Sequence, residues 1–143
     1  MIGKCLCGEV QFEIAGEIPN LYQCHCSLCR KVTGSSANAA TFVDQENYKW
    51  LSGQDNIRSY IKETGFRSDF CNTCGSPVPN KLRDTIKYWI PAGLLEEVEG
   101  LEVVEHIYTN SKAQWDIIGG HGTQHEEIPS LEVLNKALQQ AGC

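Results

Sequence analysis

The sequence predicts a mainly β fold of short antiparallel strands with one short helix near the C-terminus. One segment alternates apolar and polar side chains with the period of a half-buried strand. Several further short apolar segments are separated by glycine, proline, asparagine and aspartate, the residues that form turns. In only one segment do leucines recur at the spacing of a helix face, which is longer than the two-residue period of a strand. Many short strands with turns between them are typical of an all-β sheet assembly.

The clearest strand covers residues 9–15. Val10, Phe12 and Ile14 share one face of it, whereas the alternate side chains are polar. Gly8 and Gly16 bound the segment as turn residues. Further strands, in chain order, are predicted at residues 39–43, 48–51, 57–61, 66–70, 86–90 and 101–107.

A short amphipathic helix is predicted at residues 130–141. Leu131, Leu134 and Leu138 recur at helical spacing, so they form one apolar face. Ser130 can cap the N-terminus and Gly142 can end the helix. A single helical turn is also predicted at residues 29–32.

Length and composition indicate one globular domain over residues 1–143. Apolar residues make up 41% of the chain and charged residues 21%, values typical of folded proteins. No run of 18 apolar residues exists, so no membrane span is expected. The formal net charge of −6 argues against a nucleic-acid partner, because phosphate contacts need a basic surface. The N-terminal residues lack the apolar segment of a signal peptide, so a cytoplasmic location is expected.

The chain contains eight cysteines, a high number for its length. Cysteines in a reducing cytosol rarely form disulfides, and close pairs deliver two sulfurs to one metal ion. The spacing therefore favours metal binding over a disulfide framework. Seven of the cysteines form three clusters: Cys5-Leu-Cys7, Cys24-His-Cys26-Ser-Leu-Cys29 and Cys71-Asn-Thr-Cys74. Cys143 stands apart as the last residue.

Seven clustered cysteines divide into a group of four and a group of three. Cys24, Cys26 and Cys29 are close enough in sequence to meet one ion. The two remaining pairs would form a closed four-sulfur site. Zinc takes four ligands in structural sites and three plus an open position in catalytic sites. The four cysteines of the predicted closed site are Cys5, Cys7, Cys71 and Cys74.

The sequence also predicts the local backbone structure around each pair of the four-cysteine site. Cys5 and Cys7 are two residues apart, so they would point to one face of a strand. Cys71 and Cys74 follow a predicted strand and lead into Gly75, which suits a tight turn with an open backbone position.

Other metal arrangements stay open at this stage. Sulfur ligands also suit iron–sulfur clusters or copper(I). The three-cysteine site would be closed if a fourth ligand came from elsewhere in the chain. The candidates are His25, His106, His121 and His125.

Three motifs resemble the glutathione-dependent formaldehyde-activating enzyme family, whose human relative is centromere protein V. They are Cys5-x-Cys7-Gly8, then Cys24-His25-Cys26-Ser27-x-Cys29-Arg30-Lys31-x-x-Gly34, and Arg67-x-x-Phe70-Cys71-x-x-Cys74-Gly75-Ser76. The stretch His106-Ile107-Tyr108 with Ser111-Lys112-Ala113-x-Trp115 is also similar to the family. The resemblance covers roughly residues 3–118. The segment 92–96 and the tail from residue 119 depart from the family pattern.

The resemblance implies a zinc-binding fold of the β-tent type with two zinc ions per chain. It implies structural zinc at Cys5, Cys7, Cys71 and Cys74. It implies catalytic zinc at Cys24, Cys26 and Cys29, where the ion can be labile. The implied activity is that of a carbon–sulfur lyase, S-hydroxymethylglutathione synthase, which condenses formaldehyde with glutathione.

Two functional hypotheses follow. In the first, the protein is a zinc enzyme that joins a small aldehyde to a glutathione-type thiol, and Arg30 holds a substrate carboxylate. In the second, it is a non-catalytic zinc module that binds a protein partner, or a carrier of the thiol or its adduct. A pocket open to the three cysteines would favour the enzyme. A large exposed apolar patch away from the metals would favour the module.

Overall fold

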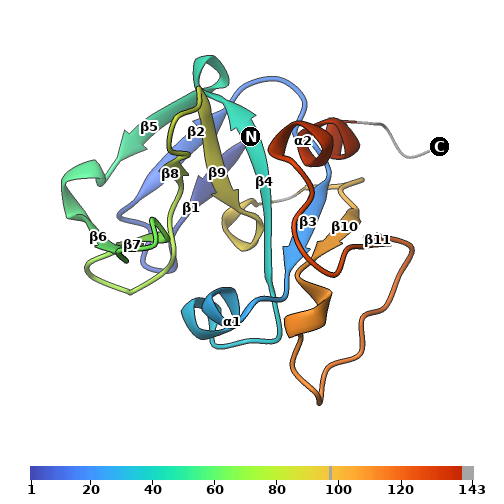
Figure 1. The fold of residues 1–143 in the computed structure, drawn as a ribbon. Coiled ribbons are helices and arrows are strands. Elements are labelled where there is room, and N and C mark those ends of the chain that lie inside the picture. Colours follow the sequence, from blue (N-terminus) through green and yellow to red (C-terminus); the bar gives the residue numbers. More distant parts are fainter. Residues whose placement is uncertain (97, 140–143) are drawn as a thin grey trace. The chain divides into compact units, whose positions relative to one another are not determined.

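The computed structural model describes residues 1–96 and 98–139. The chain divides into two units, each assembled from two separate stretches of sequence. The first unit comprises Met1–Ile18 and Phe42–Glu99. The second comprises Pro19–Thr41 and Gly100–Cys143. Figure 1 shows both units with their elements labelled, and each unit is described by itself below.

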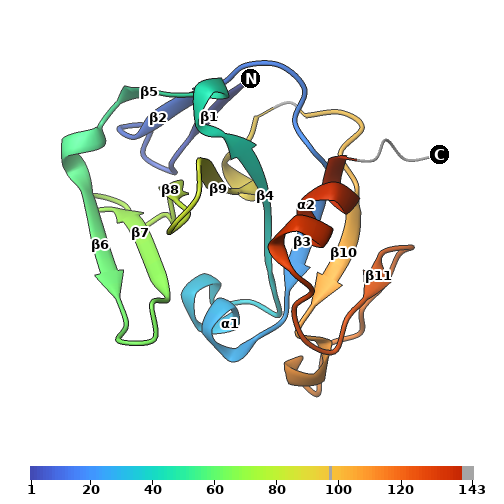
Figure 2. The ribbon, with the colours of Figure 1, turned by 45° about the horizontal axis from the view of Figure 1, so that its top comes forward.

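The first unit consists of short antiparallel strands. Its three-stranded sheet has the order β1-β2-β5, formed by Ile2–Lys4, Gln11–Ile14 and Tyr48–Ser52. Strands β6 (Ile57–Ile61) and β7 (Arg67–Cys71) form an antiparallel hairpin, which Figure 2 shows clearly. Strand β8 (Asn80–Lys81) pairs antiparallel with β9 (Lys87–Pro91). Among the described residues, this unit also contains 3₁₀ helices at Gln45–Asn47, Gln54–Asn56 and Ala92–Leu94.

The core of the first unit lies on the inner face of its strands. Phe12 and Ile14 are buried on β2 together with Val43 and Ile90. The Tyr48 ring stacks on Phe12 at a centroid distance of 5.6 Å. The alternation that predicted the strand at residues 9–15 therefore corresponds to a real buried face, because every second side chain of a strand points to the same side.

The second unit combines four strands with two helices. Its strands have the order β11-β10-β3-β4, formed by Thr123–Gln124, Val103–Ile107, Leu21–Cys24 and the first part of Asn38–Asp44. Strand β4 pairs antiparallel with β3, whereas β10 runs parallel to both β3 and β11. Helix α1 spans Ser27–Thr33 and helix α2 spans Leu131–Gln139. A 3₁₀ helix at Thr109–Ser111 follows β10.

Local capping explains the two helices. The Cys26 side chain accepts a hydrogen bond from the Cys29 backbone N–H at the start of α1, and Gly34 ends this helix in the left-handed conformation. At the start of α2, the Ser130 hydroxyl accepts a hydrogen bond from the Val133 backbone N–H at 3.2 Å. Leu134 and Leu138 are the buried residues of α2. Two leucines of the predicted helical face thus pack, whereas Leu131 at the start of the helix is 36% exposed.

The structure confirms the mainly β prediction and the short C-terminal helix. All seven predicted strands exist, within two residues of the expected bounds at each end. The predicted turn at residues 29–32 belongs to α1. The expected helix end at residues 140–141 lies outside the described residues. Among the described residues, no helix combines the length and apolar character needed to cross a membrane.

One expectation was wrong in detail. Cys5 and Cys7 do not lie on a strand, because β1 ends at Lys4 and a turn follows. Besides the antiparallel pairs, the structure contains a strand, β10, that runs parallel to both of its neighbours. Strands β1, β3, β8 and β11 were not predicted.

Candidate metal centres

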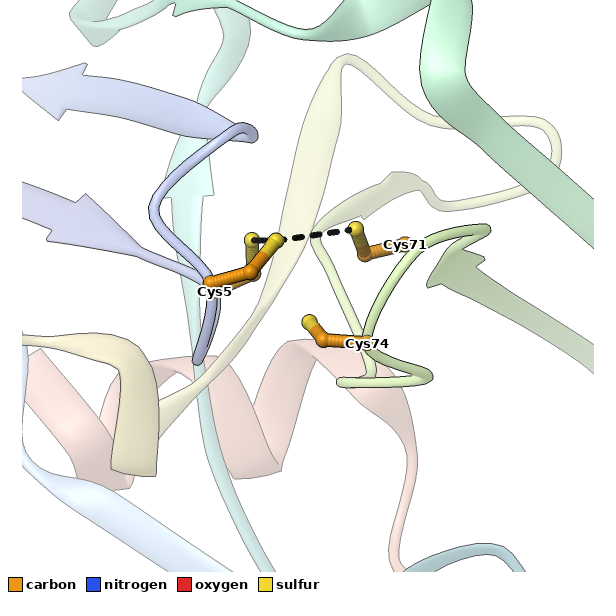
Figure 3. Close-up of side chains that lie close together, drawn as sticks. Cys5, Cys71 and Cys74 are labelled. Carbon is orange, nitrogen blue, oxygen red and sulfur yellow. Dashed lines mark hydrogen bonds between the residues drawn. The ribbon is translucent and has the colours of Figure 1, made fainter.

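Four cysteines of the first unit converge on one point. The sulfurs of Cys5, Cys7, Cys71 and Cys74 all lie within 4.8 Å of one another. The Cys5 and Cys7 sulfurs are 3.5 Å apart, and those of Cys7 and Cys71 are 3.8 Å apart. Figure 3 shows Cys5, from the turn after β1, facing Cys71 and Cys74 at and just after the end of β7. The structure thus brings together the four residues that sequence reasoning grouped.

Backbone turns present these sulfurs. The Cys5 N–H donates to the Val10 carbonyl at 3.0 Å, which closes the turn that carries the first pair. The Gly75 N–H donates to the Cys71 carbonyl at 2.8 Å and closes the second turn. Gly75 has a φ of 75°, a left-handed conformation that costs glycine nothing. The expected tight turn at this position is confirmed.

Hydrogen-bond donors also approach the sulfurs of this group. The Val10 N–H lies 3.3 Å from the Cys5 sulfur, and the Asn56 side-chain amide lies 3.6 Å from the Cys71 sulfur. Burial opposes ionisation of Cys74, but hydrogen bonds led by that of the Ser76 hydroxyl lower the pKa of its thiol to about 5. Such donors stabilise the thiolate form, which is the form that binds a metal.

The four-cysteine group fits a tetrahedral zinc ion. With zinc–sulfur bonds of about 2.3 Å, tetrahedral geometry places the sulfurs roughly 3.8 Å apart. The sulfur–sulfur separations of 3.5 Å and 3.8 Å are close to this value. Four thiols without a carboxylate among them are the donor set of a closed structural site.

The second unit holds a group of three cysteines. Cys24 ends β3, Cys26 is the N-cap of α1, and Cys29 lies in the first turn of that helix. Their sulfurs all lie within 4.8 Å of one another. Hydrogen bonds from the Cys24 and Cys29 side chains lower the pKa of the Cys26 thiol to about 2. One thiolate is therefore favoured in this group even without a metal, since its neighbours donate to it.

No histidine joins the three cysteines in the part of the chain that the structure describes. The His25 ring is hydrogen-bonded to His106 instead, with 3.0 Å between Nε2 and Nδ1. The other nitrogen of His25 lies 3.7 Å from an Asp116 carboxylate oxygen. His125 contacts the Glu105 carboxylate. The donor set at this group is thus three thiols, one fewer than a closed zinc site requires.

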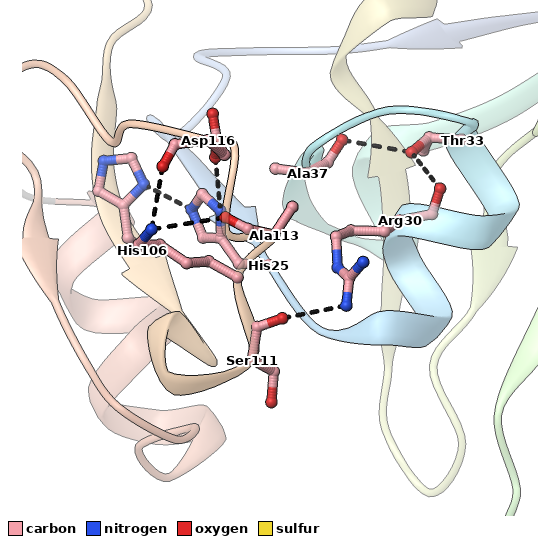
Figure 4. Close-up of polar contacts among 9 residues, drawn as sticks. His25, Arg30, Thr33, Ala37, His106, Ser111, Ala113 and Asp116 are labelled. Carbon is pink, nitrogen blue, oxygen red and sulfur yellow. Dashed lines mark hydrogen bonds and ion pairs between the residues drawn. The ribbon is translucent and has the colours of Figure 1, made fainter.

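A cavity of about 480 Å³ lies beside the buried histidines. It is lined by His25, His106, His121, Asp116 and neighbouring residues of the same unit, and none of the three cysteines lines it. Figure 4 shows the His25–His106 pair and Asp116 together. The sequence analysis expected an enzyme to have a pocket that opens onto the three cysteines. This cavity is therefore not that pocket.

Arg30 follows the three-cysteine group on α1. Its guanidinium Nη2 donates to the Ser111 carbonyl at 3.2 Å, as Figure 4 shows. Its Nε–H is buried and has no hydrogen-bond partner. No described carboxylate forms an ion pair with Arg30, whereas Lys31 is simply exposed. Arg30 thus keeps unused hydrogen-bonding capacity close to the cysteines.

Comparison with known proteins identifies the family. The family model of the glutathione-dependent formaldehyde-activating enzyme matches residues 1–111. This chain belongs to that family. The match includes all seven clustered cysteines and stops slightly before the end of the range that the resemblance suggested.

Individual relatives of this family member are more distant. A Halomonas elongata protein, provisionally named a glutathione-dependent formaldehyde-activating enzyme, is 30% identical over 80 residues. That alignment covers 52% of this chain and 51% of the relative, so the chain spans about half of the relative's length. A crystal structure of a Rhodobacter sphaeroides protein is similar with a TM-score of 0.57 and 28% identity. The alignment covers 69% of this chain and 91% of the Rhodobacter sphaeroides chain.

Sequence reasoning found the cysteines of this family member but missed what supports them. Sequence reasoning considered His25 and His106 as extra metal ligands, whereas in the structure they are hydrogen-bonded to each other. Asn56 was not singled out, and Tyr108 entered only as part of the family resemblance, without a role. The residues of the His25–His106 pair lie 81 positions apart, so no local pattern could join them. Cys143 lies outside the described residues.

Proposed function

We propose that this protein is a zinc-dependent enzyme that condenses formaldehyde with a glutathione-type thiol to give an S-hydroxymethyl adduct. The reverse reaction is that of a carbon–sulfur lyase. The observation that carries the proposal is the group of three thiols within 4.8 Å, which lacks a fourth described ligand, in a member of this family. The full chain, residues 1–143, would act as one zinc-binding domain.

The two cysteine groups would have different roles. Cys5, Cys7, Cys71 and Cys74 would hold a structural zinc ion, since four thiols complete its ligand set. Cys24, Cys26 and Cys29 would hold the second ion. When bound there, zinc supplies a positive charge that lowers the pKa of a thiol and polarises a carbonyl oxygen.

The reaction needs no oxidant or reductant. The thiol loses a proton and its sulfur forms a bond to the aldehyde carbon. The carbon–oxygen double bond becomes a single bond, and the oxygen takes up a proton from water. Holding the thiol and the aldehyde side by side lowers the entropic part of the barrier.

Arg30 would position the thiol substrate. Glutathione carries two carboxylates, and a guanidinium binds a carboxylate with two parallel hydrogen bonds. Such a carboxylate would use guanidinium N–H groups that the Ser111 carbonyl does not occupy. Replacing Arg30 with Gln should raise KM for glutathione about tenfold and change kcat little. An unchanged KM would exclude Arg30 from substrate binding.

Exchange NMR with ¹³C-formaldehyde and glutathione tests the activity, because it measures adduct formation above the uncatalysed background. The zinc-loaded wild type should accelerate the exchange. Cys26→Ser should abolish the acceleration and keep the fold by circular dichroism. Cys143→Ser is the matched control, since it removes a cysteine outside the three clusters. Equal acceleration by Cys26→Ser and the wild type would refute the proposed mechanism.

A non-catalytic zinc module or thiol carrier is the second candidate. Trp115 and Ile117 are 73% and 90% exposed, which suits contact with a partner. Native mass spectrometry separates the candidates. Two zinc ions, with a glutathione adduct or loss of one ion on adding the thiol, support the enzyme or carrier. Two ions that do not respond to glutathione support the module. All three functions require reduced cysteines, in keeping with a cytoplasmic location.

A further inference from the structure

Tyr108 adopts a backbone conformation that bulky residues rarely use. Its φ of 55° and ψ of 41° lie in the left-handed region, where a side chain crowds its own backbone. Asp84 is the other non-glycine residue with positive φ in the part of the chain that the structure describes. Strain of this kind persists only where the surrounding structure enforces it, and it is concentrated at functional sites.

The strained residue lies directly beyond the strand that pairs with the cysteine strand. Ile107, the last residue of β10, is in register with Cys24, the last residue of β3. The His25 N–H donates to the Ile107 carbonyl at 3.0 Å. Tyr108 is therefore the first residue after β10 at the end of the sheet where the three-cysteine group begins.

Contacts on both sides hold Tyr108 in place. Its N–H donates to the Glu127 carbonyl at 3.3 Å, and its carbonyl accepts from the Ser111 N–H at 3.0 Å. The Ser111 carbonyl in turn accepts the Arg30 guanidinium, which ties this turn to α1 one residue after Cys29. The turn that carries Tyr108 is thus anchored to both elements that carry the cysteines.

The charges of the cysteine group act on the phenol of Tyr108. Burial raises the pKa of Tyr108, and the charges of Cys24, Cys26, Glu127 and Cys29 raise it further. The phenol therefore stays a neutral hydrogen-bond donor, since its ordinary pKa is already about 10. Within residues 1–96 and 98–139, its hydroxyl has no hydrogen-bond partner, so the donor is available.

We propose that the Tyr108 hydroxyl donates a hydrogen bond to the aldehyde oxygen during thiol addition at the three-cysteine site. This inference rests on the function proposed above. As the sulfur bonds to the aldehyde carbon, negative charge grows on the oxygen. A fixed donor aimed at that oxygen stabilises the charge where it develops. The oxygen then takes its proton from water, and the phenol keeps its own.

Tyr108→Phe isolates this role because it removes only the hydroxyl and keeps the ring. Tyr60→Phe is the matched control, since Tyr60 is 58% exposed on β6 of the other unit. Three quantities are compared with the wild type: zinc per chain, affinity for glutathione alone, and the rate of exchange with ¹³C-formaldehyde. A fourth is the affinity for the adduct formed at saturating formaldehyde.

Tyr108→Phe should keep zinc and glutathione affinity, and lower both the rate and the adduct affinity about tenfold. Tyr60→Phe should match the wild type throughout. If the wild type accelerates the exchange and Tyr108→Phe gives the same rate, the inference is overturned and the proposed function still stands. Loss of zinc from Tyr108→Phe also overturns it, because the residue then has a structural role. A wild type that gives no acceleration refutes the proposed function, and this inference with it.

Discussion

The Nε2 atom of His25 lies 3.0 Å from Nδ1 of His106, and both rings are at least 98% buried. His25 stands between Cys24 and Cys26, so its ring is attached to the backbone that presents two sulfurs. The His106 ring comes from β10, whose backbone also pairs with β3. The hydrogen bond between the two rings therefore holds the Cys24–Cys26 backbone through a side chain. The pairing of β3 with β10 holds the same backbone through the main chain.

His106→Leu should destabilise the protein and weaken metal binding at the three cysteines. The substitution leaves the buried Nε2 of His25 without a partner, which costs about 1–3 kcal/mol of unfolding free energy. Chemical denaturation measures this loss, and a zinc-chelator competition measures the metal affinity. His121→Leu is the control, because His121 is exposed. Equal unfolding free energies for the two variants would contradict this role of the pair.

The unfolding free energy should fall below pH 6.5, in part because of His106. Burial lowers the pKa of His106 below its ordinary 6.5, although the nearby carboxylates of Glu105 and Asp116 oppose the shift. Below that pH the unfolded chain binds a proton that the folded chain resists, so this contribution is complete above pH 6.5 and is lost on acidification. One such proton gives a slope of up to about 1.4 kcal/mol per pH unit.

Urea denaturation of the wild type and His106→Leu between pH 7.5 and 5.5 measures this slope. Protonation of the cysteines affects both proteins, so it cancels in the difference. The wild type should lose more stability than the variant over this range. Parallel pH profiles would show that His106 does not contribute.

The sequence predicts well what local patterns determine. The face formed by Val10, Phe12 and Ile14 is visible because one side of a strand packs on the core. The cysteine groups are visible because C-x-C and C-x-x-C place two sulfurs within reach of one ion. The leucines of α2 are visible because they recur at the helical period.

What the sequence does not predict depends on distant pairing. Strand β3 has only four residues, too few for a clear alternation. Its parallel pairing with β10 joins Cys24 to Ile107, and no local signal specifies that register. The strained turn at Tyr108 depends on the same pairing. Each unit is also built from two separate stretches of chain, which composition does not reveal.

Gly122→Ala should disturb the histidine pair. A Cβ atom at this position would lie 2.8 Å from Cδ2 of His106 and 3.1 Å from the Val103 carbonyl oxygen. The His106 ring cannot move aside without losing its bond to His25, so a loss of about 1–3 kcal/mol is expected. Thermal and urea unfolding measure it. Gly119→Ala is the control, because its added Cβ meets nothing within 4 Å. Similar stabilities of both alanine variants would show that the ring has room to shift.

Asn56→Ala should speed metal loss from the four-cysteine group. The Asn56 amide lies 3.6 Å from the Cys71 sulfur and donates to the Thr73 hydroxyl at 2.9 Å and to the Glu9 carboxylate. It thereby links the turn between Cys71 and Cys74 to the loop that follows Cys7. Partners of this kind change metal affinity about 10- to 100-fold.

Chelator competition with a colorimetric zinc indicator measures the rate of metal loss from Asn56→Ala and from a control, Asn72→Ala. Asn72 follows Cys71 directly, but its side chain is exposed to solvent, so its variant should release zinc at the wild-type rate. Two metal sites are expected, so zinc release should have a fast and a slow phase. Cys26→Ser assigns each phase to a site, because it removes a ligand only from the three-cysteine group. Acceleration confined to the phase that Cys26→Ser leaves unchanged supports the link. If Asn56→Ala and Asn72→Ala release this zinc at equal rates, the sulfurs are held by their backbone turns alone.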